Sequence, residues 1–159
     1  MITFVDEFFE MRMLEKKCLS LPEFRSFLRK HSLKATPQRI AIHEAMLELG
    51  HASTDMVAKH IADKGEIKIT VASLYNTLSD LADLGAYSRR TSQNNKMYFD
   101  VNTGDHIHFY DNVNNNYRDV NDKELLEIVK TKLKGRKFKG YTVDSIDVQI
   151  IGHPTKKKI

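Results

Sequence analysis

Between residues 22 and 84, apolar side chains recur every three or four positions, the spacing of one buried face of an α-helix. The pattern predicts four helices, over residues 22–31, 36–49, 53–64 and 70–84. Thr36 followed by Pro37 is a typical start, because Thr caps a helix and Pro costs no hydrogen bond at the first helical position. Gly50 and Gly85 fall where two of these helices should end. A further, appended helix is predicted within residues 1–20.

The helix predicted over residues 70–84 has an unusual polar face. Thr70 would cap it, because its hydroxyl can accept a hydrogen bond from a first-turn N–H. Its apolar stripe is expected to consist of Val71, Leu74, Leu78 and Leu81. The opposite face carries short or flat hydrogen-bonding groups: Ser73, Tyr75, Asn76 and Thr77. Such groups suit phosphates and base edges in a DNA major groove, although the pattern alone is more typical of an ordinary polar surface helix.

After residue 85 the apolar period changes to two, which predicts strands. Residues 86–91 and 96–100 are interpreted as two strands joined by the polar turn SQNN. Three helices followed by a β-hairpin is the element order of a winged helix-turn-helix. The wing would place Arg89, Arg90 and Lys96 along a DNA backbone, where contacts give affinity that depends on salt and hardly on base sequence.

A second, smaller unit is predicted beyond residues 101–104, where turn-forming residues cluster. Strands are expected over residues 106–110, 117–120 and 146–150. One helix should begin at Asn121, with Glu124 completing a capping box. Its apolar stripe would be Leu125, Leu126, Val129 and Leu133. About 55 residues make a marginal core that dimerisation or a metal would stiffen.

The fold class predicted from these elements is α+β, an N-terminal winged helix-turn-helix followed by a small α/β dimerisation domain. The expected divisions are an extension at 1–20, the DNA-binding domain at 21–100, a hinge at 101–104, the dimerisation domain at 105–153 and a basic tail at 154–159.

Composition restricts the class of protein. The 159 residues carry a net charge of +4 with a pI near 9.1, a mild basic bias that is compatible with a nucleic-acid partner. No apolar run is long enough to span a bilayer, and the acidic start is unlike a signal peptide, so a cytoplasmic protein with no membrane partner is expected. Cys18 is the single cysteine, which excludes an intramolecular disulfide and a multi-cysteine zinc site within one chain.

Side chains that bind metals gather around the predicted hinge: Asp100, Asp105, His106, His108 and Asp119. In a strand His106 and His108 would point to the same face, because side chains alternate. Imidazoles with nearby carboxylates suit Fe(II), Mn(II) or Zn(II). His-x-His alone is a weak signal, and two half-exposed strand histidines fit it equally well.

Four segments, LKATPQR, HASTDMVAKHI, TVASLYNTL and YFDVNTGDHIHFY, resemble in order and spacing the ferric uptake regulator (Fur) family of metal-responsive repressors. The resemblance runs from about Leu33 to the end of the chain and is weaker beyond Val120. It implies a homodimer that binds double-stranded DNA at an AT-rich palindromic operator. It also implies that the motif around Tyr75 enters the major groove, with Tyr75 and Arg39 as the foremost DNA contacts.

By motif position, the resemblance implies a regulatory metal site whose ligands are His51, Asp100, His106, His108 and Asp119. Fe(II) or Mn(II) would be the effector, and such donors would accept Zn(II) in vitro. The use of Asp at two ligand positions is similar to the peroxide-sensing members and to the iron response regulator (Irr) branch. The CxxC pair that holds a structural zinc in most members is replaced by Asp111 and Asn114, so that zinc cannot form.

Two further sites of the family are matched only in part by this chain. Many Irr-like proteins have three consecutive histidines proposed to bind haem, where this chain has Ile107 between two histidines. Asp105 and His153 stand where ligands of an accessory metal site would be, and both are interpreted first as surface groups. Haem therefore stays open as an alternative effector.

The leading hypothesis is a dimeric, iron-status-responsive transcription regulator, a repressor of iron or oxidative-stress genes and not an enzyme. A peroxide sensor would use the same five ligands, so the sequence does not separate the two. A small metalloenzyme would need an open metal position, and five protein ligands leave none. A DNA-binding or dimerisation adaptor with a vestigial metal site is the third alternative.

Overall fold

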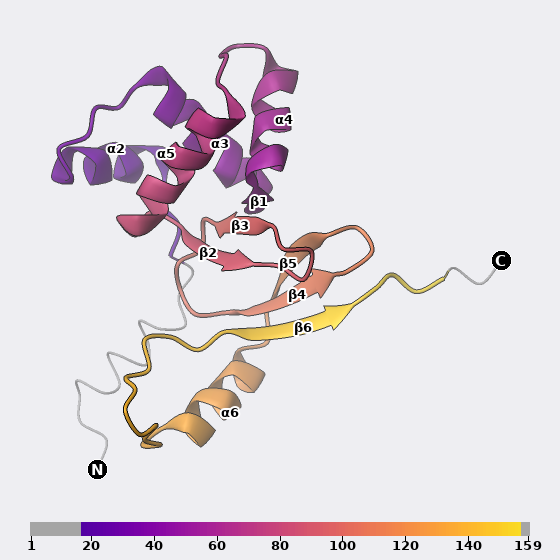
Figure 1. Ribbon diagram of the computed structural model, residues 1–159. Coiled ribbons are helices and arrows are strands. Elements are labelled where there is room, and N and C mark those ends of the chain that lie inside the picture. Colours follow the sequence, from indigo (N-terminus) through magenta and orange to yellow (C-terminus); the bar gives the residue numbers. More distant parts are fainter. Residues whose placement is uncertain (1–16, 157–159) are drawn as a thin grey trace. The chain divides into compact units, whose positions relative to one another are not determined.

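The structure is a computed structural model that describes residues 17–156, and it separates at Thr103–Gly104 into two compact units (Figure 1). Most of the helix predicted within residues 1–20 lies outside the described residues. No helix within residues 17–156 is both long and apolar enough to cross a membrane.

Four helices build most of the first unit, as the apolar spacing predicted. They are α2 (Leu21–Lys30), α3 (Pro37–Leu49), α4 (Thr54–Lys64) and α5 (Val71–Asp83). Each begins after a hydroxyl side chain that accepts a hydrogen bond from a first-turn N–H: Ser20, Thr36, Ser53 and Thr70. At the end of α5, Gly85 N–H donates to the Ala82 carbonyl and Ala86 N–H to the Leu81 carbonyl. This closing pair needs the positive φ of +94° that glycine adopts easily.

A three-stranded antiparallel sheet completes this unit, with strand order β1-β3-β2. The strands are β1 (His51–Ser53), β2 (Ser88–Thr91) and β3 (Met97–Asp100). The hairpin β2–β3 confirms the predicted wing, although β2 begins two residues later than expected. Strand β1 was not predicted, and it joins α3 directly to α4. The unit is a winged helix-turn-helix, as the sequence indicated.

The core of the first unit is formed by one face of each helix. Its fully buried side chains include Phe24, Leu28, Ile42, Met46, Val57, Leu74, Leu78 and Phe99. The predicted stripe of α5 is correct except at its first member, because Val71 is 52% exposed. Val71 is the first residue of the helix, and its side chain lies outside the packed face.

The second unit is a small sheet with one helix in sequence between its strands. Its elements are β4 (Ile107–Asp111), β5 (Asn116–Val120), α6 (Lys123–Leu133) and β6 (Val148–Gly152). Strand β4 is central, antiparallel to β5 and parallel to β6. This arrangement confirms the predicted α/β character of the second part of the chain.

Three boundaries in this unit differ from expectation. His106 lies just before β4, and β6 begins at Val148, two residues after the predicted start. The cap of α6 is Asp122, one residue after the expected Asn121, and its carboxylate accepts the Leu125 N–H at 2.9 Å. Of the predicted α6 stripe only Leu126 is buried, while the other members are half-buried.

Candidate metal centre and nucleic-acid interface

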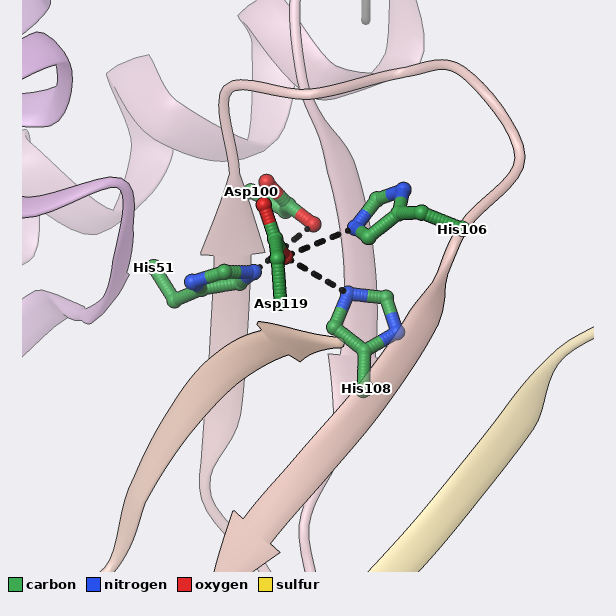
Figure 2. Close-up of side chains that lie close together, drawn as sticks. All are labelled: His51, Asp100, His106, His108 and Asp119. Carbon is green, nitrogen blue, oxygen red and sulfur yellow. Dashed lines mark ion pairs between the residues drawn. The ribbon is translucent and has the colours of Figure 1, made fainter. Parts of the chain in front are cut away.

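His51 and Asp100 form a nearly buried pair in the first unit (Figure 2). The antiparallel register of β1 and β3 sets them directly opposite each other. His51 Nε2 lies 3.1 Å from Asp100 Oδ2. The other carboxylate oxygen of Asp100 accepts the Asn102 N–H at 2.8 Å, which fixes the carboxylate. The pair depends on β1, a strand that the sequence did not predict.

His106, His108 and Asp119 form a second group, within the other unit (Figure 2). The β4–β5 register places His108 opposite Asp119. Asp119 Oδ1 lies 3.1 Å from His106 Nε2 and 3.9 Å from His108 Nε2. One ligand atom of each residue lies within 4.8 Å of those of the other two. The expected common face for the two imidazoles is present, since their ring centroids are 4.1 Å apart.

A hydrogen bond to the backbone shows which ring nitrogen of His106 carries the proton. His106 Nδ1 lies 2.6 Å from the Gly104 carbonyl, which can only accept, so Nδ1 carries the proton. Nε2 is then the basic nitrogen, and it faces Asp119. A backbone carbonyl behind an imidazole is the usual second partner of a metal-ligating histidine. The imidazole and carboxylate donors of this group suit Fe(II), Mn(II) or Zn(II).

The two residues predicted for an accessory metal site are not among these candidate ligands. Asp105 forms an ion pair with Lys130, with 2.9 Å between the carboxylate and the ammonium nitrogen. His153 is exposed, just beyond the end of β6.

The turn between β4 and β5 holds Asp111 and Asn114, which replace the family's cysteine pair. Asp111 accepts the backbone N–H groups of Val113 and Asn114 at 2.9 and 3.0 Å, and the side-chain amide of Asn114 at 2.8 Å. These bonds, the Asn114 N–H first, lower the pKa of the Asp111 carboxyl below its usual value. A hydrogen-bonded turn therefore stands at this position.

Helix α5 presents the side chains expected of a recognition helix. Ser73, Tyr75 and Asn76 are exposed, and Tyr75 is 45% accessible despite its size. Thr77 is half-buried, and its hydroxyl donates to the Ser73 carbonyl within the helix. Arg39, on α3, donates from Nη1 to the Lys34 carbonyl at 2.8 Å.

Two of the three wing cations predicted to contact DNA form ion pairs with carboxylates of the same unit. Lys96 Nζ lies 3.1 Å from Asp55 at the start of α4. Arg89 pairs with Asp83 at the end of α5. All four side chains remain largely accessible, so solvent screens both pairs.

A model of the Ferric uptake regulator family matches residues 30–150, which is most of the chain. The chain belongs to this family. Members of this family are transcription regulators and not enzymes, so the metalloenzyme alternative is set aside.

Three known proteins illustrate the relationship. The peroxide-responsive repressor PerR of Staphylococcus epidermidis is 33% identical over 89 residues, which span 55% of this chain and 59% of the relative. The Campylobacter jejuni peroxide stress regulator structure is 25% identical, covering 84% of this chain and 97% of that one, with a TM-score of 0.57. The Vibrio cholerae ferric uptake regulator has a TM-score of 0.69 at 22% identity, over 82% and 99% of the two chains, which shows the shared fold.

Proposed function

We propose that this chain is a homodimeric, metal-responsive repressor that binds double-stranded DNA and reports iron status. The proposal rests on one observation: this family member has two features together. One is a recognition helix with an exposed Tyr75, and the other is a set of His and Asp donors in both units. Genes of iron use or oxidative stress are the expected targets.

We propose that the regulatory metal is held by His51 and Asp100 of the first unit together with His106, His108 and Asp119 of the second. Three imidazoles and two carboxylates fit Fe(II) or Mn(II). When bound, the ion supplies the positive charge that keeps these donors together. The donors of the two units would then favour the DNA-competent arrangement, by the difference in affinity between the two arrangements.

The division of the chain fits this proposal. Residues 21–100 would form the DNA-binding domain, residues 101–104 the hinge, residues 105–153 the dimerisation domain and residues 154–159 the basic tail. The described chain separates next to Gly104, which supports a hinge there. A ligand on each side of the hinge is the simplest way for one ion to control the angle between two domains.

The dimer would form through the second unit. Ile150 and Ile151 of β6 are exposed, and so is Ile128 of α6. Strand β6 is at an edge of the described sheet, where an unpaired row of backbone groups can accept a partner. Two copies of the recognition helix would then suit a palindromic operator, expected to be rich in AT pairs.

Peroxide sensing is the second candidate function. The Staphylococcus epidermidis relative is a peroxide-responsive repressor, and Asp100 and Asp119 are the ligand types that suggested peroxide-sensing members. The same two Asp residues, with the Asp111–Asn114 turn in place of the CxxC pair, suit the Irr branch. Haem is the alternative effector if the metal has no effect on DNA binding.

The proposal is tested by measuring the affinity of the protein for an AT-rich palindromic duplex by fluorescence anisotropy at fixed salt. Metal-stripped protein is compared with protein loaded with Mn(II), which resists oxidation. Binding should tighten at least tenfold with Mn(II), with two chains per duplex. Tyr75→Ala should weaken binding about tenfold, as expected for one lost specific contact, while the fold is kept. Equal affinity with and without Mn(II) would refute metal activation.

A further inference from the structure

The positive charge of this protein is concentrated in one short segment. Residues 130–141, KTKLKGRKFKGY, comprise the last turn of α6 and the residues that follow it, and are here called the basic loop. The basic loop contains six cations, Lys130, Lys132, Lys134, Arg136, Lys137 and Lys139. No acidic residue lies between Glu127 and Asp144. Since the whole chain has a net charge of +4, all other residues together carry a net charge of −2.

Beyond α6, the basic loop forms a hydrogen-bonded turn and is exposed. Every residue from 134 to 145 is exposed. Tyr141 N–H donates to the Phe138 carbonyl at 2.9 Å, and Gly140 has the positive φ of +83° that such a tight turn needs. Arg136 N–H donates to the Leu133 carbonyl at the end of α6, which fixes the start of the loop. Figure 1 shows the part of the segment beyond Leu133 within the connection from α6 to β6.

Two aromatic rings stand at the ends of this turn. Phe138 is 48% exposed and Tyr141 is 83% exposed. They pair as an isolated antiparallel bridge, so the turn holds their backbones side by side. A large ring left in water gains no burial energy, and exposed rings on a charged surface often mark a binding site.

Like charges this close in sequence repel one another, and a bound anion reduces that repulsion. Lys130 is engaged by Asp105, and the next cations, Lys132 to Lys139, are exposed in a stretch without acids. Self-repulsion of this kind costs stability, and a polyanion relieves it. The partner that this surface fits is therefore an extended polyanion that also has flat faces for the two rings.

We propose that the basic loop binds single-stranded nucleic acid, with its cations on the phosphates and with Phe138 and Tyr141 stacked on unpaired bases. Proteins that bind single strands without sequence preference combine these same two elements. A duplex keeps its bases stacked on each other, so the rings would have no role there. This surface belongs to the second unit, whereas α5 and the wing belong to the first.

The test measures the affinity of the full-length protein for a fluorescein-labelled dT20 strand over a range of salt concentrations. The loop variant combines Arg136→Gln, Lys137→Gln and Lys139→Gln. The control variant removes the same charge from the chain end by Lys156→Gln, Lys157→Gln and Lys158→Gln. The loop variant should lose at least tenfold in affinity, and its salt slope should fall by about 2, since each single-strand phosphate contact contributes about 0.7. The control should change affinity less than twofold.

Tyr141→Ala keeps every charge and should still lower the affinity for dT20 about tenfold, through the loss of stacking. An equal loss in the loop and control variants would overturn the proposal, because it would reduce the effect to net charge. Unchanged affinity in Tyr141→Ala would overturn the stacking contact. Loop-dependent binding to phosphatidylserine vesicles without binding to dT20 would assign the surface to an anionic membrane instead. Circular dichroism and operator affinity, both expected unchanged, show that each variant is folded.

Discussion

At the scale of single residues, His43 is held by contacts with three other residues, Leu19, Phe24 and Tyr87. It is buried on α3, stacked on the Phe24 ring at a centroid distance of 4.0 Å. Its Nε2 lies 2.7 Å from the Leu19 carbonyl, so Nε2 carries the proton. Nδ1 then accepts from the Tyr87 hydroxyl at 2.8 Å. Neutral His43 thus joins the segment before α2 to α3 and to the residue before β2.

Because burial lowers the pKa of His43, the fold should lose stability as the pH falls below about 6.5, the usual value for an unfolded chain. In that range the unfolded chain binds one more proton than the folded one, so acid favours unfolding. His43→Gln removes this titration and should flatten the fall in melting temperature between pH 7 and pH 5. At pH 7 it should cost about 1–3 kcal/mol through the lost buried hydrogen bonds.

Thermal unfolding at a series of pH values measures both effects. His31→Gln is the matched control, because it removes one histidine from a half-buried position of the same unit. If His43→Gln unfolded with the wild-type dependence on pH, the neutral state assigned to His43 would be wrong.

At the scale of elements, the wing forms one ion pair with α4 and one with α5. Lys96 pairs with Asp55 of α4, and Arg89 pairs with Asp83 of α5. Exposed pairs of this kind are weak, so a DNA phosphate can replace the carboxylate at little cost. Each carboxylate nevertheless neutralises a cation in the unbound protein and repels an approaching phosphate.

Asp55→Asn should therefore tighten operator binding severalfold and make its dependence on salt steeper by up to about 1, the contribution of one phosphate contact. Asp63→Asn is the charge-matched control, because Asp63 pairs only along its own helix with Lys59 among the contacts described. Anisotropy titrations at four salt concentrations distinguish the two. An equal gain in both variants would show an effect of net charge alone and would contradict a local role for Asp55.

The helices could be predicted because their signals are local. A hydroxyl cap, an apolar stripe and a terminal glycine all lie within one element, as in α5. Strand β1 was missed because three residues, His51–Ser53, are too few to show alternation. The cap of α6 was misplaced by one because Asn121 and Asp122 are both good capping residues. Only the hydrogen bond from Leu125 N–H selects Asp122.

The candidate metal site could be predicted only in part for a related reason. The spacing of His106 and His108 predicts a shared face, and the structure brings them together. The partner of His51 depends on the register of β1 against β3, which pairs residues far apart in sequence. The ion pair between Asp105 and Lys130 had no sequence signal, because it joins a loop to the last turn of α6.

At the scale of the whole molecule, the central question is whether the donors of the two units hold one ion or two. A single shared ion requires that each unit lose its metal when the other loses a ligand. If each unit bound its own ion, losing a ligand in one unit would not change the metal affinity of the other. The two outcomes differ in whether the losses of metal affinity from two substitutions add up. A double-mutant cycle measures this directly.

His51→Ala removes a donor from the first unit, and His106→Ala removes one from the second. With a shared ion, wild-type protein should bind one Mn(II) per chain. Each single variant should lose at least tenfold in affinity, and the double variant should lose far less than the product of the two losses. Isothermal titration with Mn(II) gives affinity and stoichiometry together. Two ions per chain, with each variant losing only its own, would mean that no common metal joins the units. Control of DNA binding would then have to arise within one of them.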